Sequence, residues 1–431
     1  MNLVSFRIFA LTLVCLPATA SLMAPRAYLG AQSTRRGQDP SALACVWSAP
    51  KVLASAPHEA TIRWPALSGF RDTLWVAGTA FPIEESAPIH RRGLILVRTP
   101  GEQVPIPPGD FLFAYPRVGH DGHGTLHLVW LESDDEDVLA NSWMQLKFTS
   151  IWYSSFDGTR WSTPERILSA PRVAWGVEDG TLAVDAGGRI HVAAVVTNRA
   201  GTTSLFYLRR DNGSWSRRQF QRPVAYATAA RWGGGNAVAI AYTSPVGGEA
   251  FDASSVFLIT SDDAGEHWSE PALVSHSGNR LATVLTLKPD DYGGLHLVWG
   301  QNLVGGFEPQ VLRHRVTRDG KSFQTYPDAP LSPGFLRYHL VADGPNDVRA
   351  VLERFDSGRL ALNEIRWFER EVSSQQLFPQ LSAAANAGLF EKNGSAWLVW
   401  SGIAGSGNNV LPFVSARHTC TVRPALATAN P

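Results

Sequence analysis

Cysteine, methionine and net charge are scarce in this chain of 431 residues, which has 3 Cys, 3 Met and a formal charge of +0 from 38 basic and 38 acidic side chains. Balanced charge provides no field that would attract nucleic acid or an anionic membrane, so we expect neither as a partner. A glycine-rich phosphate loop, a G-x-S-x-G elbow and an H-E-x-x-H motif are also absent. The sequence therefore gives no support to nucleotide-dependent, serine-hydrolase or zinc-protease chemistry, and we expect no cofactor and no metal site.

The first 20 residues have the three parts of a signal peptide. Arg7 supplies the positive charge, Ile8 to Leu16 form a short apolar stretch, and Ala18-Thr19-Ala20 is a small-x-small cleavage sequence. The apolar stretch is too short to span a membrane. Bulky Val14 stands where a lipoprotein signal needs a small residue before Cys15. We therefore expect cleavage after Ala20 and a secreted or periplasmic product.

Cleavage would leave two cysteines, Cys45 and Cys420, at opposite ends of the mature chain. In an oxidising compartment such a pair is a candidate disulfide, and two separately buried thiols are the alternative. Residues 21–44 lack hydrophobic periodicity and are expected to be a flexible leader, and residues 423–431 a flexible tail. The remaining segment, residues 45–422, is the predicted folded domain.

Tryptophan and β-type sequence are abundant: the chain has 15 Trp, and the phrase W-S-x-P followed by aliphatic residues occurs three times. Its copies run from Trp47 to Leu53, from Trp161 to Leu168 and from Trp268 to Val274. A repeated strand ending indicates a repeated structural unit. The first copy precedes any complete unit, as if the last strand of one unit had been moved to the N-terminus.

The repeated unit is a short strand, a turn rich in Asp, Asn and Gly, a strong second strand and two further strands. The second strands are clearest at 125–130, 189–193, 294–299 and 395–400. Units open near residues 61, 112, 174, 225, 280, 336 and 381. We therefore predict an all-β fold, a β-propeller of about seven four-stranded antiparallel blades, with six blades as the alternative.

The two ends of the propeller are expected to share the last blade. Residues 410–422 suit its third strand and residues 45–53 its fourth, which would close the ring and bring Cys45 and Cys420 onto neighbouring strands. A disulfide there could stabilise the domain by about 4–5 kcal/mol on the loop-entropy model.

Ser261-Asp262-Asp263-Ala264-Gly265-Glu266-His267-Trp268 resembles the Asp box, S-x-D-x-G-x-T-W, of the sialidase (BNR-repeat) superfamily. Weaker copies lie at 154–161, 210–215 and 318–323. In each, Asp can accept hydrogen bonds from turn N–H groups, Gly can adopt a positive φ, and the final aromatic residue, Trp or Phe, can pack between sheets. The box is therefore a folding element of the outer hairpin, and the resemblance places it away from the active face.

A second fragment, Ile62-Arg63-Trp64-Pro65, is similar to the F/Y-R-I-P segment of sialidases, whose arginine grips a substrate carboxylate. Arginine suits that task because its planar guanidinium binds carboxylate in bidentate fashion. The resemblance implies further arginines, an acid/base and a tyrosine nucleophile on the same face, in the segments that lead into first strands and in the loops between second and third strands. The candidate catalytic residues are Arg63, Arg117, Arg280, Arg337, Tyr338 and Asp134, and the candidate substrate-binding residues are Trp64, Trp175 and Glu178.

Other readings of these residues stay open. The arginines could brace neighbouring blades, and the acidic run 132–137, which contains Asp134, could supply a general acid, a calcium site or a solvated surface. His127, His191 and His296 recur at one position of the repeat, which favours a repeated packing or hydrogen-bonding role over metal binding.

The sequence thus predicts an exported, monomeric, sialidase-like β-propeller that binds or hydrolyses glycans, including acidic sugars of cell-surface glycoconjugates. Whether it is an enzyme stays open; a sialidase-like glycoside hydrolase is the expected activity if it is one. A non-catalytic propeller that binds a protein or cell-surface partner is the alternative, and a polysaccharide lyase on a similar scaffold is a third hypothesis.

Overall fold

The computed structural model describes residues 44–421 with internal gaps. The gaps are 55–59, 72, 83–92, 100, 110–113, 133–147, 175–181, 201, 221–222, 234, 245–254, 277–280, 303–307, 345–346, 357–358, 369–370, 379–383, 393–394 and 403–412. The predicted signal peptide, the leader up to residue 43 and the predicted tail lie outside the described residues. No helix in the described part of the chain is long and apolar enough to cross a membrane.

Thirty β-strands make up the described structure, and they fall into antiparallel units of four or five strands. The first unit contains β3 (Ala60–Phe70), β4 (Thr73–Pro82), β5 (Gly93–Arg98) and β6 (Glu102–Gln103). The second contains β7 (Ala114–His120), β8 (Leu126–Glu132), β9 (Phe148–Phe156) and β10 (Glu165–Ala174). The third contains β11 (Leu182–Val184), β12 (Ile190–Thr197), β13 (Thr203–Asp211) and β14 (Ser214–Phe220).

The later units follow the same order. The fourth contains β15 (Ala227–Arg231), β16 (Val238–Ser244), β17 (Ser255–Ser261) and β18 (Ala272–Ser275). The fifth contains β19 (Ala282–Pro289), β20 (Leu295–Gln301), β21 (Val311–Thr317), β22 (Gln324–Thr325) and β23 (Ala329–Pro330). The sixth contains β24 (Phe335–Gly344), β25 (Asp347–Asp356), β26 (Arg359–Phe368) and β27 (Glu371–Leu377).

The seventh unit combines both ends of the described chain. It contains β28 (Ala384–Lys392), β29 (Ser395–Gly402) and β30 (Phe413–Thr421), and β30 pairs with β1 (Ala44–Trp47) and β2 (Lys51–Ala54) from the N-terminal side. The predicted sharing of one sheet by the two ends is confirmed. The register sets Cys45 directly opposite Cys420, which is the backbone arrangement that the predicted disulfide needs; the disulfide itself stays a prediction.

The described strands thus form seven units distributed over six sheets, because the second and third units are joined into one sheet of eight strands. The joining strand is β10. Its first part pairs with β9 as the outer strand of the second unit, and its last residues, Arg172 to Ala174, pair with β12 of the third. The short strand β11 completes the inner pairing with β12.

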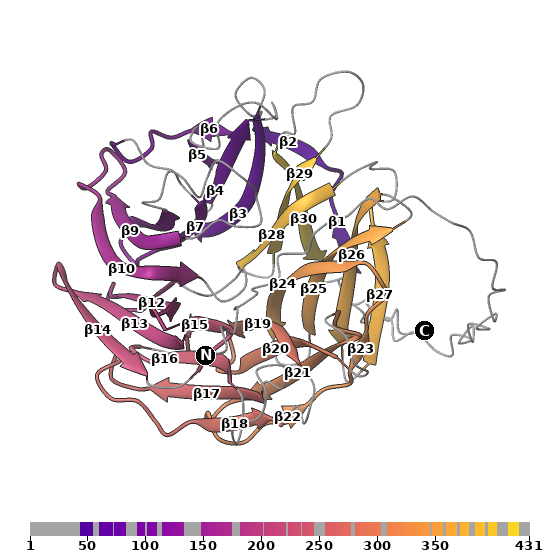
Figure 1. The fold of residues 1–431 in the computed structure, drawn as a ribbon. Helices are drawn as coiled ribbons and strands as arrows, with labels where there is room; N and C mark the ends of the chain where they lie inside the picture. The colour runs from indigo at the N-terminus through magenta and orange to yellow at the C-terminus, as the bar shows by residue number, and fades with distance from the viewer. Residues whose placement is uncertain are drawn as a thin grey trace, which may run out of the picture.

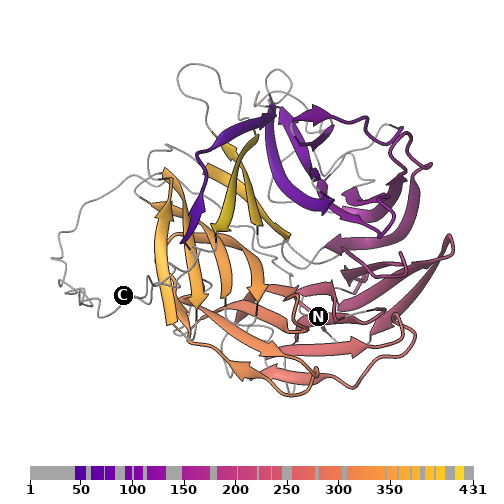
Figure 2. The same cartoon turned by 180° about the vertical axis from the view of Figure 1, so that it is seen from behind.

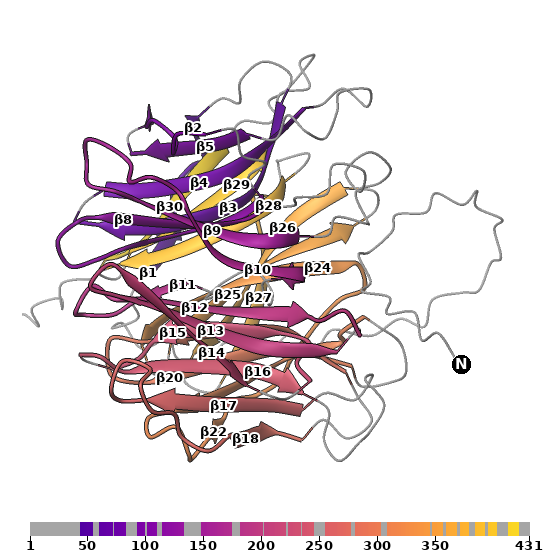
Figure 3. The same cartoon turned by 60° about the vertical axis from the view of Figure 1, so that its left-hand side comes forward.

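The units follow one another around a common centre, from indigo through magenta and orange to yellow (Figure 1), and the view from behind shows the same order (Figure 2). Each innermost strand contacts the next one along the chain, and β28 of the last unit contacts both β24 and β3. Seen from the side, the units form successive layers (Figure 3). This is the arrangement of a β-propeller, and the closed ring remains the predicted form of it.

The core lies between neighbouring units because the second strands are buried on both faces. All seven residues of β8, β16 and β20 are buried. Trp130, Trp299 and Trp400, which end the aliphatic runs of three second strands, are each 0% exposed. Such strands read as nearly continuous apolar sequence, which is why they were the strongest signal along the chain.

Candidate functional site

The strand order gives each unit two different ends. At one end, which we call the loop end, innermost strands begin and second strands lead toward third strands. At the other, the turn end, short hairpins join the first strand to the second and the third to the fourth. The loop end is the predicted functional face. Arg231 is the last residue of β15 and therefore lies at the turn end.

Irregular strand pairing recurs at the loop end. The register between first and second strands shifts in five of the described units, at Arg63/Ala66, Ala114/Arg117, Thr283/Thr286, Phe335/Arg337 and Ala385/Gly388. Three of these five shifts are bordered by an arginine that the sequence singled out. Bulges re-aim side chains and are frequent next to active sites. Local backbone geometry thus sets Arg63, Arg117 and Arg337 apart from the regular ladder.

Arg117 occupies an unusual stretch of backbone. Tyr115, two residues before it, has φ 46°, a left-handed conformation that is costly for a non-glycine residue. Its ring packs edge-on against Phe148, with centroids 5.7 Å apart. The Arg117 side chain is buried, 6% exposed, and its Nη1 donates to the Pro116 carbonyl at 3.0 Å. The second unit therefore holds a buried cation at the loop end.

Arg337 forms an ion pair within its own unit, with 3.2 Å between Arg337 Nε and Glu353 Oε2. His339 Nε2 lies 3.6 Å from the other carboxylate oxygen. Glu353 and His339 are almost fully buried, whereas the Arg337 side chain is 20% exposed. The structure thus gives Arg337 a structural partner at the loop end, and its side chain stays partly exposed.

Tyr338 does not have the position of a nucleophile. Its side chain is 0% exposed, and its hydroxyl donates to the Val298 carbonyl of the fifth unit at 2.6 Å. The alternation of β24 explains the placement: Arg337 and His339 face one side of the strand, so Tyr338 and Leu340 face the core shared with the fifth unit. The structure therefore assigns Tyr338 to packing between units, a correction to its candidacy as a catalytic residue.

The remaining candidates cannot be placed in a site. Asp134, Trp175, Glu178 and Arg280 lie outside the described residues. Arg63 and Trp64 belong to β3, but only their backbone is described. Of the acidic run, Glu132 alone is described, and it is 9% exposed at the end of β8.

The turn end is built from regular hydrogen bonds, as the Asp box shows. Ser261 Oγ donates to Asp263 Oδ1 at 2.8 Å and accepts from the Gly265 N–H at 2.7 Å, and Asp263 also accepts from the His267 N–H. Gly265 has φ +86°, and the Trp268 indole donates to its carbonyl. The hairpin geometry predicted for the box is confirmed in this unit.

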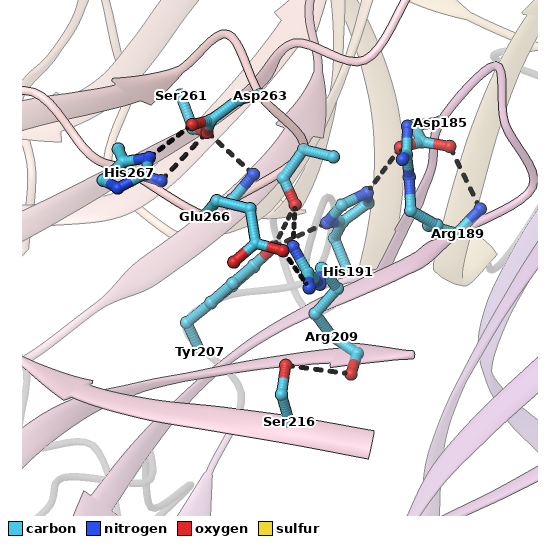
Figure 4. A network of polar contacts seen from close by, with 12 residues as sticks. Asp185, Arg189, His191, Tyr207, Arg209, Ser216, Ser261, Asp263, Glu266 and His267 are labelled. Atoms are coloured by element: carbon cyan, nitrogen blue, oxygen red, sulfur yellow. Dashed lines mark hydrogen bonds and ion pairs between the residues drawn. The ribbon is translucent and has the colours of Figure 1, made fainter. Parts of the chain in front are cut away.

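Histidines at the turn end form relays that repeat along the chain. In the third unit, His191 lies between Asp185 Oδ2 at 3.1 Å and the Tyr207 hydroxyl at 2.7 Å (Figure 4). In the fifth, His296 lies between Asp290 and His314, with 3.1 Å and 3.0 Å. The second unit repeats the pattern with His127, Tyr153 at 2.9 Å and Asp121 at 3.7 Å. The predicted hydrogen-bonding role of these histidines is confirmed.

The relay carboxylates and rings have shifted acidities. Burial by itself would raise the pKa of Asp185, but hydrogen bonds from His191 and Arg189 outweigh it and lower that pKa. The pKa of Asp290 is likewise lowered against its burial by His296 and by backbone N–H groups. Burial lowers the pKa of His127 to about 4, with Asp121 opposing the shift. The aspartates therefore stay ionised, and His127 stays neutral at pH 7.

A network extends the third-unit relay into the fourth unit. The Tyr207 hydroxyl donates to the Ala264 carbonyl inside the Asp box at 3.3 Å, and Arg209 reaches the same carbonyl at 3.2 Å and Glu266 at 2.5 Å (Figure 4). The relay thus fastens adjacent units to each other. Among the described residues, no group of three or more His, Cys, Asp or Glu side chains could hold a metal ion.

Comparison with known proteins establishes the fold and no closer relationship. No protein-family profile matches the chain, and no curated protein matches it. Solved structures do match. A protein of unknown function from Dyadobacter fermentans gives a TM-score of 0.52 at 10% identity, over 89% of this chain and 100% of its own. Polysaccharide lyase Uly1 gives 0.53 at 14% identity, over 85% and 90%, and an ulvan lyase gives 0.53 at 11% identity, over 84% and 94%. At these identities the likeness shows that the chain shares their fold.

Proposed function

We propose that this chain binds an acidic glycan at the loop end, with arginines that border the first-strand bulges as the groups that contact its carboxylates. The observation that carries the proposal is the coincidence of three register shifts with Arg63, Arg117 and Arg337. Guanidinium groups are suited to carboxylates because two parallel N–H···O bonds fix both charge and orientation.

The structural comparisons support the same class of ligand. Uly1 and the ulvan lyase, both with TM-scores of 0.53, are named as polysaccharide lyases. An ulvan lyase structure with the same score contains -[GlcA(1-4)Rha3S]-, an acidic saccharide. Because the likeness itself concerns only the fold, the proposal for this chain depends on its own arginines. Cleavage of the bound glycan, by hydrolysis or by elimination, is a further step that the experiment below separates from binding.

The test is calorimetric binding of a galacturonate oligomer to the wild-type protein and to Arg63→Ala and Arg117→Ala. We expect each substitution to weaken binding by about tenfold or more, since a hydrogen bond to a charged group is worth roughly 1.5–3 kcal/mol. Arg231→Ala is the matched control, because this exposed arginine ends an innermost strand at the turn end. Thermal melts of each variant separate a loss of ligand contact from a loss of fold.

The same samples decide the reaction. Release of a fluorophore from a sialic-acid glycoside would indicate a hydrolase, and the ultraviolet absorbance of an unsaturated uronate would indicate a lyase. Binding without either product supports a binding protein. Equal affinity of wild type, Arg63→Ala and Arg117→Ala would overturn the proposal and leave the non-catalytic scaffold for a protein partner as the better hypothesis.

A further inference from the structure

Two clefts flank β14, the outer strand of the third unit, on the outer rim of the propeller. The first, of about 200 Å³, lies between the third and fourth units. Its floor is apolar and buried, with Leu205, Val224 and Ile259 at 0 to 2% exposure. Its rim carries the exposed Arg218 and Glu270.

The second cleft, of about 340 Å³, lies between the second and third units and is lined by Leu168, Val196, Phe206, Arg217 and Gln219, among others. Apart from Arg217 it has no charged lining residue among those described. The two clefts therefore share β14 as a common wall.

The alternation of β14 divides its residues between the clefts. Arg217 and Gln219 line the cleft toward the second unit, and Arg218 and Phe220 line the cleft toward the fourth. Successive residues of a strand point to opposite faces, so Arg217 lies at the cleft toward the second unit and Arg218 at the cleft toward the fourth. An exposed outer strand with adjacent arginines would be expected to direct both into solvent; here each stands at the rim of an apolar hollow.

The chemistry of the first cleft fits a sugar ring. Phe220 and Trp268 meet edge to face with centroids 5.8 Å apart, and the Arg218 guanidinium lies 5.2 Å from the centroid of the Phe220 ring. The apolar floor can cover the C–H face of a pyranose, while Arg218, Ser269 and Glu270 can bond its oxygens. Together the two clefts are lined by two arginines and one carboxylate, so their net charge is positive.

From this arrangement we infer that the outer wall of the third unit is a second carbohydrate-binding surface, which takes an acidic glycan chain across β14 with one sugar ring in each cleft and with Arg217 and Arg218 at its carboxylates. The surface is separate from the loop-end arginines, because β14 is the outermost strand of its unit and Arg63 and Arg117 belong to innermost strands of other units.

The test is the stoichiometry of galacturonate oligomer binding, measured by calorimetry at low salt. We expect two binding events for the wild type, and the double variant Arg217→Glu/Arg218→Glu should lose one of them, with at least a tenfold drop in affinity. Arg160→Glu is the control for the charge reversal, since this side chain is 88% exposed on a hairpin of the second unit and the substitution makes the same change in net charge as each of the two in the double variant. Melting curves check that the variants fold.

The outcomes distinguish this inference from the loop-end proposal. If Arg63→Ala leaves one binding event that the double variant removes, the outer surface stands whether or not the loop end binds glycan. A methyl-esterified oligomer, which has no carboxylates, should bind the outer surface at least tenfold more weakly. Unchanged stoichiometry in the double variant, or equal binding of the esterified oligomer, would overturn the inference.

Discussion

The turn end and the loop end of the propeller differ in how regularly their structure repeats from unit to unit. At the turn end, an aspartate holds a hairpin and a histidine in three units, in nearly the same geometry each time. At the loop end, the backbone shifts register in five of the described units, but an arginine borders the shift in three of them, at Arg63, Arg117 and Arg337, and not in the other two. A feature that repeats around a propeller serves the fold, whereas a feature that differs between units can serve a ligand. Stability should therefore respond most to changes at the turn end.

The largest expected effect comes from the seventh unit. Its third and fourth strands, β30 and β1, are not joined by a hairpin, because they are the two ends of the domain. A Cys45–Cys420 disulfide would supply the missing connection at that turn end. We expect Cys45→Ser, Cys420→Ser and the double variant each to lower the free energy of unfolding by about 4–5 kcal/mol.

The cysteine measurement is chemical denaturation with and without reductant, together with thiol counting of the denatured protein. A bridge requires that the two single variants and the double variant lose equal stability, because either substitution opens the same bond. Additive losses, or free thiols at both Cys45 and Cys420 in the unreduced protein, would show that the two cysteines are not bonded. The turn end would then have no covalent link in the seventh unit.

The next effect should come from the relay aspartates. Asp185 is 1% exposed and bonds Arg189 and His191, so Asp185→Ala should cost roughly 3–5 kcal/mol by leaving these groups without their acceptor. Asp121 holds its histidine at 3.7 Å, and Asp121→Ala should cost less, roughly 1–3 kcal/mol. Denaturant midpoints measure both. Equal losses would contradict the ranking that the two distances give.

A smaller effect should appear as pH dependence in the second unit. The pKa of His127 falls to about 4 on folding, while the unfolded side chain keeps a pKa of about 6.5. The unfolded state therefore binds the extra proton first, and as pH falls from about 6.5 to about 4 the native state should lose up to about 3 kcal/mol. The lowered pKa values of Asp185 and Asp290 affect stability at lower pH, because the stability that these carboxylates contribute is lost only as pH falls below about 4.

His127→Gln is the matched variant, since its amide cannot be protonated in this range and can still bond Tyr153. Thermal melts of both proteins across that window should show a shallower decline for the variant. Parallel declines would mean that His127 does not carry the acid sensitivity of the turn end.

How far the sequence could predict this molecule follows the same division. The second strands, their Asp-Gly turns and the Asp box were readable because each is encoded by residues close together along the chain, and the structure confirms them. The merging of the second and third units through β10 was not readable, because it depends on where one irregular strand ends relative to another unit.

The candidate site was less predictable for a physical reason. Whether an arginine braces a neighbour or faces a ligand is set by residues distant in sequence: Glu353 holds Arg337, and the Val298 carbonyl of another unit accepts from Tyr338. The bulges that border the arginines also have no local sequence signature. The relay partners Tyr153, Tyr207 and His314 were missed as well, although their recurrence on third strands could have identified them.

The smallest expected loss of stability comes from a glycine substitution in one of the repeated turns, and its size should depend on which turn is changed. Asn212 and Gly213 have φ of 49° and 82°, the two left-handed residues of a tight hairpin, and a Cβ at Gly213 would meet nothing within 4 Å. Gly213→Ala should therefore lower the free energy of unfolding by about 1 kcal/mol, which is the cost of placing a residue with a Cβ in the left-handed conformation. Gly213→Asn should cost less, because Asn tolerates the left-handed region. At Gly265 a Cβ would overlap the Tyr207 hydroxyl, so Gly265→Ala should cost clearly more than Gly213→Ala in the same denaturation assay. If the two alanine variants lose equal stability, the hydrogen bonds of Tyr207 and Arg209 to the Asp box contribute little to holding the third and fourth units together.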